Sequence, residues 1–299
     1  MLSLKLITVA MLTSFVLSGA LPLACRSNSR DNRNMVLTST DSNGDLKVLA
    51  EGSVSPISTS FLGVFRDAET YAALRAQATN LPELKADFFK SNLVIAAFLG
   101  QRNTGGYSIA MVQEPNGKIR IAEKAPAKDA IVNQMITSPF KLVSMATNGT
   151  PPVQLSLDER FNQRAQLYRI SNGSFTVSGG FAGRTEQYKL AGKLQVMRLG
   201  GVVSIGFGIV SEGASREHSL RDFATGVASE DTVAISKLSR GSLVDSPSGD
   251  LTVRAKFAEK NRLLIDLTTG PVIVPDGYSG KGMIEAQMVA ASANAETRP

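Results

Sequence analysis

His218 is the only histidine of the chain and is the residue that a serine-based catalytic site would need first. A serine nucleophile requires a histidine as its base and a carboxylate that orients the imidazole. The surrounding stretch, EGASREHSLRDF, has the polar composition of a surface loop. We therefore interpret His218 as a solvated histidine and keep a hydrolase as an alternative. Its candidate partners in the sequence are Ser215, Glu217, Ser219 and Asp222.

Other catalytic patterns are missing from the sequence. A single histidine excludes a histidine-rich metal site. The stretch GVVSIG has the wrong spacing for a nucleophile elbow or a phosphate-binding glycine loop. Glu230 and Asp231 are adjacent, and their side chains point to opposite faces if they lie on a strand, which makes them poor partners for acid and base catalysis. The sequence therefore predicts a protein that is not an enzyme and holds neither a metal nor a cofactor.

The composition describes a globular chain with room for two domains. It has 299 residues, of which 43% are hydrophobic and 19% are charged. The 32 basic residues exceed the 26 acidic ones by six, but they are scattered and form no run that could grip phosphates. We therefore expect no nucleic acid partner.

The N-terminus carries an export signal. Lys5 is the only charged residue before an uncharged stretch, Leu6 to Ala24, which ends at the single cysteine, Cys25. The segment resembles a bacterial lipoprotein signal, although Pro22 stands where an aliphatic residue is usual. That resemblance implies a signal peptide over residues 1–24, lipidation of Cys25, and a membrane-anchored protein of the cell envelope that faces the periplasm or the exterior.

Two other interpretations of the N-terminus remain open. Ser18-Gly19-Ala20 fits a small-x-small cleavage site, which would give a secreted or soluble periplasmic protein. The apolar stretch is also nearly long enough to remain as an uncleaved anchor. Residues 25–45 are polar and poor in large apolar side chains, which predicts a disordered tether, and we expect a disordered tail over residues 293–299.

The first predicted domain spans residues 46–150 and combines strands with one helix. Asp67 can cap a helix that places Tyr71 and Leu74 on one face. The run LVIAAFL, from Leu93 to Leu99, shows no polar alternation and predicts a central strand that is covered on both faces.

A loop and a hairpin follow this strand. Gln101 to Gly106 forms the loop, and Pro115-Asn116-Gly117 gives a hairpin turn between the strands Tyr107 to Glu114 and Lys118 to Glu123. The paired glycines can adopt a positive φ or allow a close backbone approach. These residues therefore predict two antiparallel strands with a glycine-containing loop at their base.

This part of the chain resembles the C-terminal domain family of PrcB, a lipoprotein subunit of a surface protease complex. A strand that ends in Leu-Gly precedes a Thr-Gly-Gly-Tyr-Ser turn, and Ser138-Pro139-Phe140 introduces a later strand but lacks the first aromatic of the family. The resemblance implies an interaction or accessory subunit of a cell-envelope protease. The residues expected to contact the partner are Asn103, Thr104, Gly105, Gly106, Tyr107, Pro139 and Phe140.

Two alternatives concern the same loop. Chagasin-type inhibitors of cysteine proteases carry a similar loop before an aromatic residue, but the stretch from Asn103 to Tyr107 lacks their proline. In the other alternative the glycines serve turn geometry alone and Tyr107 packs inside. The first would make the protein a protease inhibitor, and the second would leave the loop without a partner.

The second predicted domain spans residues 151–292 and begins at Pro151-Pro152. Short strands joined by tight turns predict an antiparallel β meander, either a barrel or a curved sheet, so the whole chain is mainly β with an α+β first domain. Gly206 and Gly208 leave one face of a strand bare, which favours sheet curvature but could also leave room for a ligand. A ligand-carrying β-barrel lipoprotein with a docking domain is therefore a further alternative.

Overall fold

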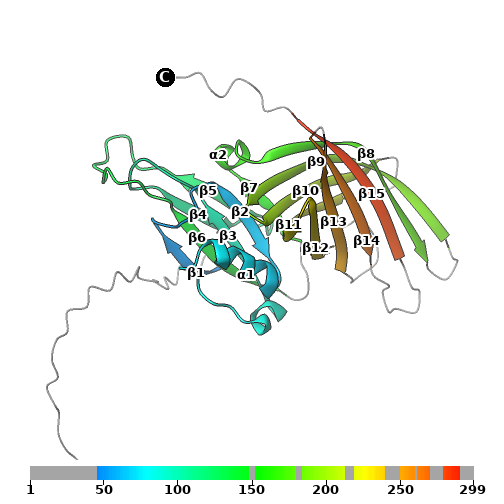
Figure 1. The fold of residues 1–299 in the computed structure, drawn as a ribbon, viewed down its shortest axis with the longest axis horizontal. Coiled ribbons are helices and arrows are strands. Elements are labelled where there is room, and N and C mark those ends of the chain that lie inside the picture. The colour runs from blue at the N-terminus through cyan, green and yellow to red at the C-terminus, as the bar shows by residue number, and fades with distance from the viewer. Residues whose placement is uncertain are drawn as a thin grey trace, which may run out of the picture. The chain divides into compact units, whose positions relative to one another are not determined.

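The computed structural model describes residues 46–147, 152–179, 184–212, 219–239, 250–259, 261–269 and 279–289 (Figure 1). All of them belong to one compact unit, residues 36–299. The predicted signal, tether and tail lie outside the described residues, as do Cys25, Pro151 and His218. Among the described residues, no helix combines the length and the apolar character needed to cross a membrane.

A four-stranded antiparallel sheet forms the centre of the first half. Its order is β1 (Leu46–Gly52), β6 (Phe140–Ala146), β3 (Asn92–Phe98) and β2 (Phe61–Phe65). Every residue of β3 after Asn92 is buried, and the strand is paired on both sides. The predicted central strand is therefore confirmed.

One α-helix, α1 (Ala68–Gln77), follows β2 and buries Tyr71 and Leu74. Its first turn is capped as expected, because the Thr70 amide donates to Oδ1 of Asp67 at 2.8 Å. A short 3-10 helix, η1 (Ala86–Lys90), then leads into β3. The prediction of one helix in the first domain, capped by Asp67, is confirmed.

A second, three-stranded sheet contains β4 (Ser108–Gln113), β5 (Ile119–Lys124) and β7 (Leu155–Leu157). The hairpin between β4 and β5 turns at Gly117, whose φ of +78° explains the need for glycine. β7 pairs with β5 in parallel, and the short helix α2 (Glu159–Asn162) follows it. The segment after Pro152 therefore joins this sheet before the next part of the fold begins.

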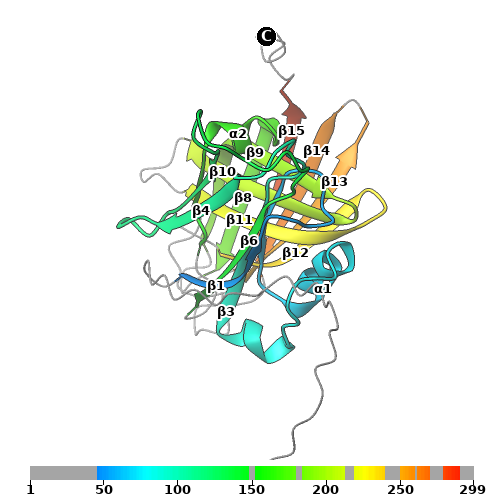
Figure 2. The ribbon, with the colours of Figure 1, turned by 90° about the vertical axis from the view of Figure 1, so that its left-hand side faces the viewer.

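Eight antiparallel strands form a closed barrel in which neighbours in sequence are neighbours in space, and β15 closes it against β8 (Figures 1 and 2). The prediction of an antiparallel meander is confirmed, and of its two forms the structure shows the barrel. The strands are β8 (Gln166–Gly179), β9 (Arg184–Leu199), β10 (Val202–Glu212), β11 (Ser219–Ser229), β12 (Thr232–Ser239), β13 (Asp250–Ala258), β14 (Arg262–Thr269) and β15 (Ser279–Met288).

The barrel interior is filled by its own side chains. Residues that alternate along the strands, such as Val253, Ile265 and Ile284, are fully buried and belong to one continuous apolar cluster. At one end the guanidinium of Arg198 stacks on the ring of Phe257, 3.5 Å from its centroid. This packing argues against the alternative in which the barrel encloses a ligand.

The outer face of the barrel at β10 and β11 packs on the first half of the protein. Phe223 and Val202 belong to the apolar core that also contains β2 and β3. The Val64 amide donates to Oγ1 of Thr225 at 2.8 Å, and Nη2 of Arg66 lies 2.7 Å from Oδ1 of Asp222. The contact between barrel and sheet thus combines apolar burial with a buried ion pair.

Candidate functional site

Gly100 lies two residues after the end of β3 and directly before the loop that is predicted to bind a partner. Gly100 has a φ of +71°, and a Cβ at this position would lie 2.7 Å from the Ser58 carbonyl oxygen and 2.8 Å from the Ser60 nitrogen. The Gln101 amide donates to the same Ser58 oxygen at 2.9 Å. Only glycine fits between these backbones, so the chain turns sharply and is fixed at the base of the loop.

Arg102 fixes the next position of the loop. Its Nε and Nη2 donate to the two carboxylate oxygens of Glu123 on β5, at 3.2 and 2.7 Å, and its Nη1 donates to the carbonyl oxygens of Leu99 and Gln101. The side chains of Arg102 and Glu123 are only 9% and 4% exposed. A two-pronged, buried ion pair of this kind holds both groups in one geometry.

A second arginine, Arg160, binds Glu123 from the exposed side, with Nη1 2.9 Å from Oε1. Burial alone raises the pKa of Glu123, but the pairs with Arg102 and Arg160 outweigh it and leave the pKa below its ordinary value. The carboxylate therefore stays charged and keeps holding the loop.

The tip of the loop lies against the segment 126–137. Arg102 and Thr137 exchange two backbone hydrogen bonds, at 2.8 and 2.9 Å, and the Gly105 amide donates to the Asn133 carbonyl oxygen at 2.8 Å. Gly106 has a φ of +84°, and a Cβ there would lie 2.9 Å from Cβ of Pro126. The glycines therefore serve both turn geometry and close packing.

The predicted contact residues of the loop differ in exposure. Asn103 and Gly106 are exposed, whereas Thr104, Gly105 and Tyr107 are half-buried. The Tyr107 ring packs on the edge of the first core, and its centroid lies 5.7 Å from the guanidinium carbon of Arg102. Tyr107 is thus partly a structural residue and still presents part of its side chain to solvent.

Pro139 and Phe140, the other two predicted contact residues, are buried. The Phe140 ring stacks on Phe98, with centroids 5.9 Å apart, and the Leu99 amide donates to the Pro139 carbonyl oxygen at 2.9 Å. These residues join β6 to the end of β3. They can therefore contribute to a contact surface only indirectly, as the support of the loop.

Sequence reasoning missed a group of exposed apolar side chains beside the loop, which we call the apolar rim: Val54, Ile131, Met135 and Ile136. They are 45%, 104%, 53% and 60% exposed, respectively. Three of them lie on the segment that is bonded to the loop, and Val54 follows Ser53, whose carbonyl oxygen accepts from the Ser138 amide at 2.9 Å. Exposed apolar side chains that are concentrated on one short surface segment, as Ile131, Met135 and Ile136 are, favour an interaction site.

The residues considered for catalysis are only partly described. Ser215, Glu217 and His218 lie outside the described residues. Oδ1 of Asp222 accepts from Arg66 Nη2, from the Val153 amide at 2.8 Å and from the Phe223 amide at 2.7 Å. Burial raises the pKa of Asp222, and Arg66 opposes this rise. In the part of the chain that the structure describes, no group of three or more His, Cys, Asp or Glu residues could hold a metal ion.

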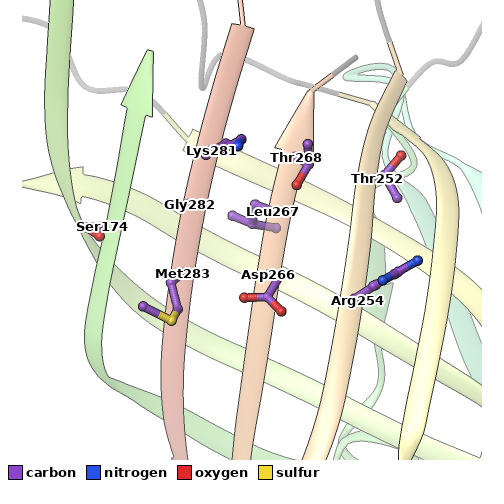
Figure 3. A pocket seen from close by; sticks show the side chains of 9 residues that line it. All are labelled: Ser174, Thr252, Arg254, Asp266, Leu267, Thr268, Lys281, Gly282 and Met283. Atoms are coloured by element: carbon purple, nitrogen blue, oxygen red, sulfur yellow. The ribbon is translucent and has the colours of Figure 1, made fainter. Parts of the chain in front are cut away.

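An open depression of about 720 Å³ lies on the outer wall of the barrel, over β13, β14, β15 and β8 (Figure 3). Arg254, Asp266 and Met283 stand side by side in register on three of these strands, and Lys281 lies next to Met283 on the same face. Charges of both signs and an exposed methionine give this surface no preference for one kind of ligand. It also lies outside the filled interior, so it is not the cavity that a carrier would need.

Together these features define a small β domain with a braced surface loop, packed on a closed antiparallel barrel. Residues 93–146 match the protein family described as PrcB C-terminal, which confirms the resemblance seen in the sequence. The match runs from β3 to β6 and includes the loop and three of the four residues of the apolar rim; the rest of the chain is unrecognised. No curated protein matches the chain.

Proposed function

We propose that the protein is a non-enzymatic accessory or interaction subunit of a cell-envelope protease, and that it contacts its partner through the loop 101–107 and the apolar rim. The observation that carries the proposal is the position of the rim. Ile131, Met135 and Ile136 lie inside the segment that matches the PrcB C-terminal family, and they flank the loop that carries the family motif.

The geometry suits a protein contact. Apolar side chains at the centre of an interface supply most of its affinity when they are surrounded by polar groups. Here the loop offers Asn103 and Thr104 next to the rim, and its backbone is already fixed by Arg102 and Gly100. A fixed loop loses little conformational freedom on binding, which favours affinity.

We further propose that lipidated Cys25 anchors the protein to a membrane of the bacterial cell envelope, with its folded part facing the periplasm or the exterior. The 21 residues from Cys25 to Asp45 would act as a flexible spacer with an average span of roughly 25 Å. Intact mass after globomycin treatment tests this: accumulation of the uncleaved precursor supports lipidation, whereas normal processing supports the secreted or soluble periplasmic form.

An affinity pull-down from the native envelope tests the proposed partner. The wild type should retain a protease, and a variant with Ile131→Gln, Met135→Gln and Ile136→Gln should retain about tenfold less or none. Met283 on the barrel wall is 63% exposed, somewhat more than Met135, so Met283→Gln is the control and should behave as the wild type. Equal retention by the triple variant would remove the rim from the proposal.

The same pull-down separates a subunit from an inhibitor. A protease that remains active toward a peptide substrate while it is bound to the protein supports the accessory role. A bound protease without activity would favour the chagasin-like alternative.

A further inference from the structure

A hollow of about 260 Å³ lies where the barrel strands β9, β10 and β11 meet the segment that carries β7. Two rows of residues in register form its barrel side. One row is Lys193, Gly208 and Arg221, and the other, two residues along each strand, is Gln195, Gly206 and Phe223.

The two glycines of β10 have different consequences. At Gly206 a Cβ would lie 2.5 Å from the Phe223 ring, so this aromatic side chain fills the space that the glycine leaves. At Gly208 a Cβ would meet only the Lys193 carbonyl oxygen, at 3.3 Å. The absent side chain of Gly208 therefore leaves real space, with a cation on each side of it.

The polar groups around the hollow are predominantly cationic. Lys193 and Arg221 flank Gly208, and Lys118 approaches from the β4–β5 hairpin. Within the described residues, none of these three forms a salt bridge. The nearby carboxylate of Asp222 is already paired with Arg66. A net positive hollow of this kind attracts anions.

The remaining lining is apolar or amide. Leu155 and Leu167 are half-buried and provide apolar surface, and Gln154 and Gln195 provide amide groups that can donate hydrogen bonds. The volume corresponds to about nine water molecules at 30 Å³ each. The hollow is therefore suited to a small molecule that has an anionic head and a short apolar body.

We propose that this hollow is a binding site for a small organic carboxylate, whose carboxylate lies between Lys193 and Arg221 over Gly208 and whose apolar part contacts Leu155 and Leu167. Arginine suits this role because its planar fork matches the two oxygens of a carboxylate. The site is formed only in the folded chain, so its ligand stabilises the folded state, and the stabilisation rises with the logarithm of the ligand concentration above the dissociation constant. This proposal does not depend on the protease partner.

Titration calorimetry and thermal unfolding of the folded chain, at constant ionic strength, test the site with phenylacetate, acetate and benzylamine as probes. We expect phenylacetate to bind and to raise the melting temperature, acetate to bind more weakly, and benzylamine not to bind. Acetate binding as tightly as phenylacetate would overturn the apolar part of the site. Equal binding of benzylamine, or no binding of phenylacetate at millimolar concentration, would overturn the site as a whole.

Variants locate the binding. Lys193→Gln and Arg221→Gln should each weaken phenylacetate about tenfold or more, because each removes a charged hydrogen-bond donor. Gly208→Val should abolish binding by filling the hollow, and its backbone φ allows a side chain. Lys256→Gln, an exposed lysine elsewhere on the barrel, is the control and should leave affinity unchanged. Unchanged affinity in both charge variants would place the ligand elsewhere and refute the proposal.

Discussion

Replacing Asp222 with alanine should lower the free energy of unfolding by about 3 to 5 kcal/mol, because it removes a carboxylate that pairs with the buried Arg66. The two side chains are 6% and 0% exposed, and their nitrogen and oxygen atoms lie 2.7 Å apart. The amides of Val153 and Phe223 also lose their acceptor, and each buried unsatisfied donor costs about 1 to 3 kcal/mol. The total loss will be smaller than the sum of the lost ion pair and the two unsatisfied amides, because the surrounding structure relaxes and water can enter the site.

A double-mutant cycle with Arg66→Met isolates the ion pair from these other losses. The double variant should lose less free energy of unfolding than the two single variants lose together, and the difference gives a coupling energy of about 2 to 3 kcal/mol. Urea unfolding at pH 7, followed by fluorescence or circular dichroism, provides the free energies. The half-exposed pair Lys141 and Glu51, at 2.8 Å, is the matched control and should couple by less than about 1 kcal/mol. Equal coupling in the two cycles would refute the claim that burial makes the Arg66 pair a main contact between sheet and barrel.

Three further predictions concern the first half of the protein. Gly100→Ala should destabilise by at least about 2 kcal/mol because its Cβ meets backbone atoms, whereas Gly117→Ala, at a similar φ but in open space, should cost only about 1 kcal/mol in urea unfolding. Glu123→Gln should strongly lower the free energy of unfolding at pH 7. Because the pKa of Glu123 is lowered in the folded protein, its stabilising effect is complete above about pH 4.5 and is lost as the pH falls through the folded pKa. The free energies of unfolding of the wild type and the variant should therefore converge in acid. Burial raises the pKa of Tyr71 to about 12, so the free energy of unfolding of the wild type should fall as the pH rises from 10 to 12. Tyr71→Phe should reduce this fall; it also removes the hydrogen bond to the Pro82 carbonyl oxygen.

Local signals made much of the fold predictable. The apolar run from Leu93 to Leu99 indicates a doubly covered strand, Asp67 caps its helix, and Asn116-Gly117 forms a hairpin turn. Each of these depends on residues that are close in sequence. The barrel followed from the spacing of strands and turns, but its closure by β15 against β8 brings together segments about a hundred residues apart, which no local pattern encodes.

The candidate site was predictable only in part. The motif identified the loop 101–107, but its bracing depends on Glu123, 21 residues from Arg102. The exposed side chains of Ile131 and Met135 would be assigned to a core from residue type alone, because most apolar residues are buried. The cationic hollow depends on two features, namely that Phe223 fills the space at Gly206 and that Gly208 is left open, and only the strand register reveals them.

Site-specific photocrosslinking in native cells tests the proposed function most directly. A photoreactive residue at Met135 should form a covalent adduct with a protease of the cell envelope, identified by mass spectrometry, and the same residue at Met283 should not. A protease adduct that forms equally from both positions, or from Met283 alone, would contradict the proposal that the loop and its apolar rim are the contact surface.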